Sequence, residues 1–358
     1  MGVYQAENRS RELGEYWWKK KEMVHEAVFN AVGYLDNTQK YRSEMNLHHL
    51  RLYGGMPVRG LGPGEYYRSA ALGSDRLTLN VVKSVIDAVV ARTASNDPKA
   101  TVLTDDGDYA LQRRAKEMEK FAAGQFYATG LYETGLDVFR DGCVFGTGIL
   151  KMYDTAGEIC AERVFPDEIL VDDVDGAYGA PRSLFQRKEC PPEVLAECYP
   201  KFKNDILQAD LAHDETGSER ETLVDMVSVV EAWHLPSGHE AEDGRHVIAI
   251  SNATLIDEPW ERDYFPFEFF RWSKRPRGFW GMGLAEELCG IQVEINKILR
   301  KVQALMNLAT SKVFLQKGSQ VIKSHLNNED WGVIEYTGQP PVFSTVQAVS
   351  PEYFQHLD

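Results

Sequence analysis

A long heptad-patterned stretch in the last quarter of the chain constrains the fold more than any other feature. From residue 283 to 310 it contains no proline, and its one interior glycine is Gly290. This predicts a single helix of roughly 42 Å, with a narrow apolar row along one side. Such a row cannot enclose a core alone, so it predicts partner helices, which we expect from other copies of the chain. Alternating steps of four and three residues separate the members of the row: Leu284, Leu288, Ile291, Ile295, Ile298, Val302, Leu305 and Ala309.

Charge is unevenly distributed along the sequence. Residues 271–323 carry ten Lys and Arg against three Glu, a net charge of +7, whereas the whole chain carries −15. The remainder of the chain therefore carries −22. Within the predicted helix the acidic residues come early and the basic residues late, which suits the helix dipole. A solvent-exposed face explains any single charge here, but it does not explain their segregation.

Composition excludes several classes of protein. A length of 358 residues with 43% hydrophobic content fits one large or two modest globular domains. We expect neither a transmembrane helix nor a signal peptide, because long apolar runs are missing. Five cysteines without a CxxC pair predict free thiols in a reducing compartment. An acidic chain with a pI near 5.1 is unsuited to gripping DNA over its whole surface, although it can surround DNA.

The apolar pattern predicts an α+β fold, with a helical N-terminal half packed on a small sheet and followed by the long helix. We expect an irregular loop rich in Gly and Pro after residue 49, and tight-turn chemistry at 154–157. The expected helices are 10–32, 80–94, 108–140 with a break near Gly130, 191–199 and 283–310. The expected strands are 99–103, 148–153, 159–165, 169–171, 183–187, 225–234, 246–251 and 254–256.

Catalytic motifs are missing from the sequence. The glycine cluster at 142–148 lies between a predicted helix and a predicted strand, the reverse of the order in dinucleotide-binding folds, and predicts a tight turn. We therefore predict no enzymatic activity, catalytic residue, cofactor or metal. One alternative stays open, a divalent-cation site at Asp172, Asp173 and Asp175, because hard cations prefer clustered carboxylates. His48 and His49 lack a nearby third ligand, which favours structural or surface roles.

An aromatic cluster between Trp260 and Trp280 permits two interpretations. Phe265, Phe267 and Phe269 alternate as in a half-buried strand, which predicts core or subunit-interface packing. Basic residues at 271, 274, 275 and 277 are interleaved with the aromatic ones, and this arrangement also suits stacking on nucleic-acid bases.

The order of these features resembles the portal, or head-to-tail connector, proteins of tailed bacteriophages. The resemblance covers about residues 75–345, and it lies in the order of the motifs because each motif alone is degenerate. The motifs are NVVKSVIDAVVARTASNDPKA, DVFRDGCVFGTGILKMYD, VFPDEILVDD, PRSLFQRKECPPEVLAECYP, YFPFEFFRW and GFWGMGLAEELCGIQVEINKILRKVQALMNLA.

The resemblance implies a portal-like fold with an N-terminal arm at 1–75, a wing domain at 76–275, a stem helix at 276–312 and the start of a β-containing clip at 313–358. Portal proteins continue through a second stem helix, a channel helix and a crown. They form rings, usually of twelve subunits, at one capsid vertex, where double-stranded DNA passes during packaging and ejection. The implied partners are further copies of the chain, DNA without sequence specificity, terminase, head-completion or tail adaptor proteins and the major capsid protein. The implied location is the virion, after assembly in the host cytoplasm, with no membrane partner.

The resemblance also suggests roles for particular residues. The subunit interface of the stem would contain Leu284, Leu288, Ile291, Ile295, Ile298, Val302 and Leu305. Candidate contacts to DNA in the channel are Lys297, Arg300, Lys301 and Lys312. Two rival interpretations remain, another oligomeric virion adaptor or scaffold protein, and a metal-dependent enzyme that uses Asp172, Asp173 and Asp175.

Overall fold

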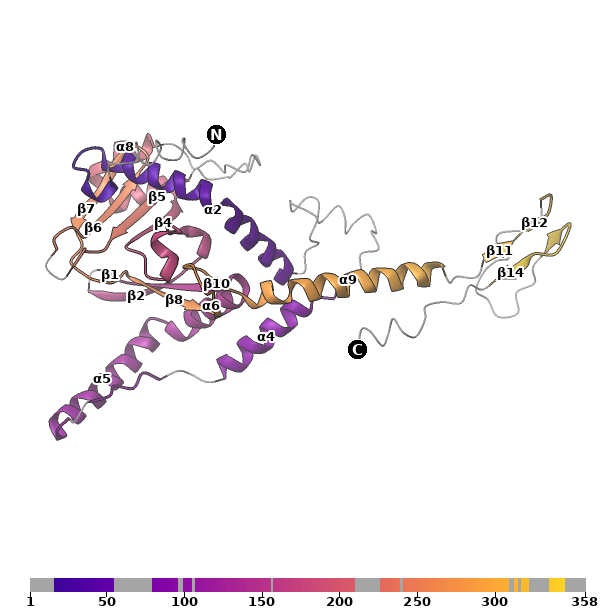
Figure 1. Ribbon diagram of the computed structural model, residues 1–358, viewed down its shortest axis with the longest axis horizontal. Helices are drawn as coiled ribbons and strands as arrows, with labels where there is room; N and C mark the ends of the chain where they lie inside the picture. The colour runs from indigo at the N-terminus through magenta and orange to yellow at the C-terminus, as the bar shows by residue number, and fades with distance from the viewer. Residues whose placement is uncertain are drawn as a thin grey trace. The chain divides into compact units, whose positions relative to one another are not determined.

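The fold is α+β, as predicted, and its contacts divide the chain into two compact units. Unit 1 contains residues 1–54 and 82–287, and unit 2 contains residues 55–81 and 288–358. The assignment of arm, wing, stem and clip stays a prediction. The computed structural model (Figure 1) describes residues 16–54, 79–95, 99–104, 107–155, 157–209, 226–238, 241–308, 312–314, 317–321 and 335–344.

Before the long helix, helices come first along the chain, and strands with a few short helical segments follow. The helices are α2 (Val24–Gly54), α4 (Val81–Ala94), α5 (Tyr109–Ala128), α6 (Leu131–Phe145), α7 (Pro192–Cys198) and α8 (Lys203–Leu207), with 3-10 turns η1 (Trp17–Lys19), η2 (Pro166–Glu168), η3 (Asp175–Tyr178) and η4 (Pro200–Phe202). The strands are β1 (Thr147–Thr155), β2 (Glu158–Val164), β3 (Ile169–Leu170), β4 (Ser183–Cys190), β5 (Val227–His234), β6 (Arg245–Ile250), β7 (Ala253–Pro259), β8 (Phe267–Arg271), β9 (Ser273–Lys274) and β10 (Gly281–Met282).

Two antiparallel sheets form the centre of unit 1. The larger sheet has the order β3-β4-β5-β6-β7, and the smaller has the order β2-β1-β8. Side chains alternate between the two faces of a strand, so Val230 and Ala232 of β5 pack toward α2 while Trp233 packs toward the smaller sheet. The predicted meander of three strands is confirmed as β5, β6 and β7.

Helices cover the outer faces of both sheets (Figure 1). Val24, Val28 and Val32 recur at helical spacing along α2 and are buried against the larger sheet. Each such side chain contributes about 1.5–3 kcal/mol when fully buried. On the other side, α6 packs on the smaller sheet, where the rings of Phe139 and Phe270 lie 5.0 Å apart. The layers therefore run α2, five-stranded sheet, three-stranded sheet, α6.

The prediction for the first helix was wrong in its boundaries. It was expected at 10–32, whereas α2 begins at Val24 and continues to Gly54, through residues 50–54 that were expected in a loop. Polar Gln39, Asn46 and His49 occupy buried positions in its second half, so the apolar periodicity weakens while the helix continues. Residues 10–15 and the rest of the expected loop lie outside the described residues.

Two further predictions concern residues 99–140. The predicted strand at 99–103 was wrong, because the backbone N–H of Val102 donates to the Glu119 carboxylate rather than to a neighbouring strand. The predicted break between α5 and α6 is confirmed at Gly130, which has a φ of 63°. Glycine adopts this left-handed conformation at little cost, so the chain can change direction there.

The long helix is confirmed as α9 (Leu284–Leu308). Its first residues belong to unit 1, and the rest belongs to unit 2. Four short strands follow in two antiparallel pairs, which agrees with the expected β character of this region. These are β11 (Lys312–Phe314) with β14 (Val342–Ser344), and β12 (Gln320–Val321) with β13 (Tyr336–Thr337). Ala309 and residues 331–334 lie outside the described residues.

Candidate functional site

Close backbone contacts fix the base of α9 in unit 1. A Cβ on Gly148 would lie 1.9 Å from the carbonyl oxygen of Val138, and a Cβ on Gly281 would lie 2.2 Å from the carbonyl oxygen of Gly146. The backbone N–H of Gly281 also donates to Thr147 Oγ1 at 2.9 Å. We call this contact, with Gly283 at its edge, the glycine joint. The predicted tight turn at 142–148 is confirmed, and its glycines serve close packing.

The apolar row of α9 is only partly covered within one chain. Leu284 and Val302 are buried, whereas the Ile291 side chain is 55% exposed. Leu288, Ile295 and Ile298 are half-buried, and the side chain of Leu305 lies outside the described part of the structure. An exposed isoleucine inside a regular apolar row leaves surface that a partner helix could cover.

Gln292 is a polar anchor on α9 that sequence reasoning missed. It is buried, its Nε2 donates to the carbonyl oxygen of Leu79 at 2.5 Å, and its Oε1 accepts from the N–H of Val81 at 2.8 Å. The side-chain amide therefore pairs with the main chain that enters α4. In the sequence, Gln292 stands out only because it follows Ile291, a member of the apolar row. That position does not distinguish a buried glutamine from a solvent-facing one.

The basic residues of α9 lie mainly on the side away from the apolar row. At about 100° per residue, Arg300 lies opposite Ile291 and Lys297 about 120° from it, whereas Lys301 lies about 80° away, at the border of the row. All three are exposed, and Lys297 Nζ lies 2.7 Å from Glu294 Oε1. Such a surface pair contributes little stability, so these cations stay accessible to an anionic partner. Lys312 begins β11, and its side chain lies outside the described part.

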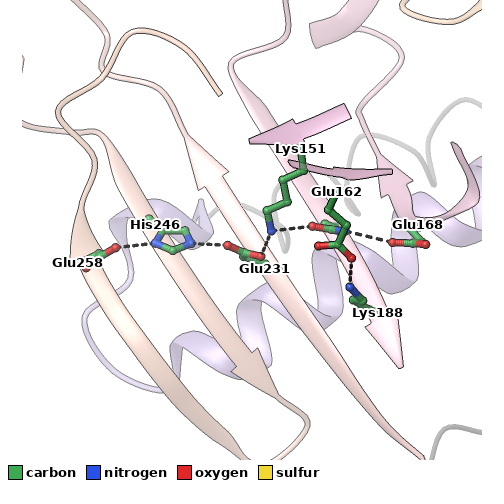
Figure 2. Close-up of polar contacts among 8 residues, drawn as sticks. Lys151, Glu162, Glu168, Lys188, Glu231, His246 and Glu258 are labelled. Carbon is green, nitrogen blue, oxygen red and sulfur yellow. Dashed lines mark hydrogen bonds and ion pairs between the residues drawn. The ribbon is translucent and has the colours of Figure 1, made fainter. Parts of the chain in front are cut away.

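Charged side chains join across the space between the two sheets of unit 1 (Figure 2). Lys151 Nζ on β1 donates to Gln186 Oε1 on β4 at 2.9 Å and to Glu231 Oε2 on β5 at 2.5 Å. Glu231 Oε1 lies 3.0 Å from His246 Nε2 on β6, and His246 Nδ1 lies 2.7 Å from Glu258 Oε1 on β7. Gln186 Nε2 continues to Glu168 Oε2 at 3.0 Å. We call this the polar chain: Glu168, Gln186, Lys151, Glu231, His246 and Glu258.

Strand register produces the polar chain. Gln186 lies directly opposite Glu231, and His246 lies directly opposite Glu258. Their side chains share one face of the larger sheet, and Lys151 reaches them from the smaller sheet. Lys188 and Glu162 make a second, more exposed ion pair beside it.

The contacts of the polar chain shift the pKa values of its members. Burial alone would raise the pKa of Glu231, but hydrogen bonds and charge from His246 and Lys151 outweigh it, so the pKa lies below its usual value. Burial alone would lower the pKa of His246, yet hydrogen bonds to Glu231 and Glu258 raise it. Both shifts favour the charged forms.

The polar chain is suited to holding the sheets together rather than to reacting with a substrate. Lys151 Nζ has two protein acceptors and lies 5.0 Å from the centre of the Trp233 ring. Both functional atoms of the Gln186 amide are also used. Sequence reasoning missed this cluster, although a charged residue on the inward face of a predicted strand, such as Lys151 within GILKMY, is a usable signal.

Two of the three aspartates proposed as an alternative metal site, Asp172 and Asp175, accept hydrogen bonds from nearby main-chain N–H groups. Asp172 accepts from the N–H groups of Val174 and Asp175 at 2.8 and 3.0 Å, and Asp175 accepts from those of Arg182 and Ser183 at 2.7 and 3.0 Å. Both carboxylates therefore stabilise the loop around η3. Among the described residues, no group of three or more His, Cys, Asp or Glu side chains could hold a metal ion.

The structure also shows the environment of the two adjacent histidines and the state of the cysteines. His49 is buried and His48 half-buried on α2, so the structural or surface roles expected for them agree with the structure. All five cysteines are free thiols, as predicted.

The aromatic cluster mainly serves the core. Phe267 and Phe279 are buried between the sheets, and Trp260, Phe265, Phe269 and Trp280 pack against that core. Two of the basic residues in this segment also have protein partners. Arg271 Nε donates to the carbonyl oxygen of Phe279 at 2.6 Å, and Arg275 pairs with Glu286. Packing is therefore the interpretation that the structure favours over base stacking.

No protein-family model matches the sequence, and no curated protein matches it as a relative. Within the described ranges, every helix is too short or too polar to cross a membrane.

Proposed function

We propose that this protein is a portal subunit, which assembles into a ring at one capsid vertex and surrounds double-stranded DNA during packaging and ejection. Terminase would dock on the ring first, and head-completion or tail adaptor proteins would follow. The ring would be part of the virion, next to the major capsid protein. The observation that carries this proposal is the division of α9 into an incompletely covered apolar row and a separate basic face.

The apolar row supports assembly. Side-by-side packing of helices around a ring requires two contact faces on each helix, because every subunit meets a neighbour on either side. Part of the row, including Ile291, is exposed in the single chain and would be buried in such a ring. The residues proposed for this subunit interface are Leu284, Leu288, Ile291, Ile295, Ile298, Val302 and Leu305.

The charge distribution supports passage of DNA rather than tight binding. Most of the chain is acidic and repels phosphates, which favours sliding. Lys297, Arg300, Lys301 and Lys312 would provide a few guiding contacts along the channel. Such contacts need no base recognition, in keeping with DNA of any sequence.

The test is negative-stain imaging of the purified protein combined with mass measurement. We expect rings whose central hole is wide enough for duplex DNA. Ile291→Asp should reduce them to smaller species, because it places a charge in the interface. The monomer should still fold, because this position is half exposed in the single chain. The matched variant Arg300→Ala, on the other side of α9, should keep the ring mass and alter DNA retention.

Each alternative gives a different result. Rods or compact oligomers without a hole would favour an adaptor or scaffold protein that uses α9 for coiled-coil assembly. Rings that survive Ile291→Asp but disappear with Arg300→Ala would show that the two faces of α9 are assigned the wrong way round.

A further inference from the structure

The segment that precedes α2 lies against the larger sheet without belonging to it. We call residues 16–23 the strap. Trp17 is its only buried side chain and packs on Phe185 of β4, with 5.6 Å between the ring centres. Trp18 stacks on His234 of β5, with the ring centres 3.9 Å apart. The other side chains of the strap are exposed or half-buried, so little apolar surface holds it in place.

Arg245 of β6 connects the main chain of the strap to the sheet. Its Nη1 donates to the carbonyl oxygens of Trp17, Trp18 and Lys20 at 3.4, 3.2 and 2.5 Å. The N–H groups of Lys19 and Lys20 donate to carbonyl oxygens within the strap rather than to a strand. Departure of the strap would therefore break side-chain contacts but no hydrogen bond between strands of the sheet.

Opposite charges line a cavity of about 410 Å³ between the strap and the ends of β6 and β7. Arg245 makes two hydrogen bonds to the Asp257 carboxylate, at 2.8 and 2.6 Å, so these two charges balance each other. Attraction between charges that face such an open cavity is weakened by salt, so the strap should be held less firmly as ionic strength rises. The other charged residues of the lining are three lysines and three acids: Lys19, Lys20, Lys21, Glu242, Asp243 and Glu258.

The connection between the strap and α2 has a strained backbone. Met23 has a φ of 51°, and among the described residues it is the only one other than glycine with a positive φ. This left-handed conformation is unfavourable for a residue that carries a Cβ. The Met23 side chain is 56% exposed, so packing offsets little of the strain, whereas Val24 is buried at the start of α2. The strain therefore lies between a weakly held segment and a firmly packed helix, and departure of the strap would relieve it.

We propose that the strap is a releasable element of unit 1, closed on the sheet in this structure and able to open about Met23 while α2 and the sheet stay folded. Opening separates Trp17 from Phe185 and frees a segment that is both aromatic and basic, WWKKK. Ionic strength sets the balance between the two states, because the attraction between charges opposes the strain at Met23. The inference concerns contacts within one chain, so it does not depend on the ring proposed above.

Limited trypsin digestion of the full chain tests this inference, because the bonds after Lys19, Lys20 and Lys21 become good substrates only when the strap opens. The cleavage rate of these bonds is divided by the rate for a synthetic peptide of the same sequence, which corrects for the residues around each bond. We expect this ratio to rise at least about threefold from low to high salt. It should change by less than about threefold in dilute urea, because opening exposes little surface. A ratio that ignores salt and rises steeply with urea would show that cleavage requires unfolding of unit 1, and would overturn the proposal.

Two neighbouring glycine variants test the role of Met23. Met23→Gly removes the strain, so the cleavage ratio should fall about threefold to tenfold. The matched control is Glu22→Gly, one residue earlier, where φ is not positive. This control only adds freedom to the open state, so the ratio should rise, by up to about fivefold. Both side chains are exposed, and circular dichroism should show a folded chain in each case. Changes in the same direction and of equal size would overturn the hinge at Met23.

A charge reversal tests the contribution of the cavity. Glu242→Lys places a fourth lysine opposite the strap, so the cleavage ratio should rise about twofold to fivefold at low salt and approach the wild-type value at high salt. The matched control Glu268→Lys changes an exposed residue of β8 in the smaller sheet and should leave the ratio unchanged. An equal response of the two variants would overturn the role of the cavity charges.

Discussion

Replacing Lys151 with methionine is the sharpest test of how the two sheets of unit 1 are held together. The substitution removes Nζ, so Glu231 keeps only its histidine partner and Gln186 Oε1 loses its donor. Removing one partner of a buried ion pair typically costs about 3–5 kcal/mol. The Glu231 side chain is still 22% exposed, so we expect Lys151→Met to lower the free energy of unfolding by about 2–4 kcal/mol. Methionine retains most of the apolar contacts of the lysine stem.

Two further variants make the result specific. Lys188→Met removes the neighbouring ion pair with Glu162, but the Lys188 side chain is 47% exposed, so we expect a cost of about 0–1 kcal/mol. Combining Lys151→Met with Glu231→Gln removes the unpaired charge and keeps an amide that can bond to both Gln186 and His246. The double variant should therefore lose less stability than the sum of the single variants, by about 1–3 kcal/mol.

Urea unfolding followed by tryptophan fluorescence measures these differences. Six of the seven tryptophans lie in unit 1, where Trp233 packs beside Lys151, so the signal reports mainly on that unit. If Lys151→Met costs no more than Lys188→Met, or if the effects of the two substitutions simply add, the polar chain does not stabilise the contact between the sheets.

Further predictions concern pH and glycine. The pKa of His246 is raised in the folded protein, so its stabilising effect is complete below about pH 6.5 and is lost as the pH rises through the folded value. In His246→Gln, the free energy of unfolding should therefore fall less between pH 6 and 9 than in the wild type. An unchanged pH profile would contradict this role of His246. Burial lowers the pKa of His234 from 6.5 to about 4, so stability should fall as the pH drops across that range, by at most about 3 kcal/mol. His234→Asn should flatten this acidic limb in the same urea assay, and a limb of unchanged slope would assign it to other groups. Gly148→Ala should cost more than about 3 kcal/mol because its Cβ meets a carbonyl oxygen, whereas Gly124→Ala, with open space around it in α5, should add about 0.5–1 kcal/mol. Similar melting temperatures for these two variants would refute the close packing of the joint.

Local patterns in the sequence predicted much of the fold. The heptad spacing located α9 to within two residues at either end, and alternation located β5, β6 and β7. Where burial and apolarity diverge, prediction failed. Helix α2 buries Gln39, Asn46 and His49, so the apolar periodicity weakens in its second half, although this half is as helical as the first.

The polar chain could not be predicted for a different reason. Lys151 and Glu231 are 80 residues apart, and they meet because the registers of two separate sheets place them face to face. Gln292 has the same character, since its partners at Leu79 and Val81 are more than 200 residues away. The apolar row and basic face of α9 were visible in the sequence because both depend on helical periodicity alone.

The glycine joint has a mechanical consequence. Side-chain contacts can absorb a load by changing rotamer, but backbone pressed directly against backbone has no such freedom. A force applied to the first turn of α9 therefore reaches β1 and α6 through main-chain atoms around Gly146, Gly148 and Gly281. The first turn of α9 and the smaller sheet of unit 1 are therefore rigidly connected, and a displacement of that turn also moves the sheet.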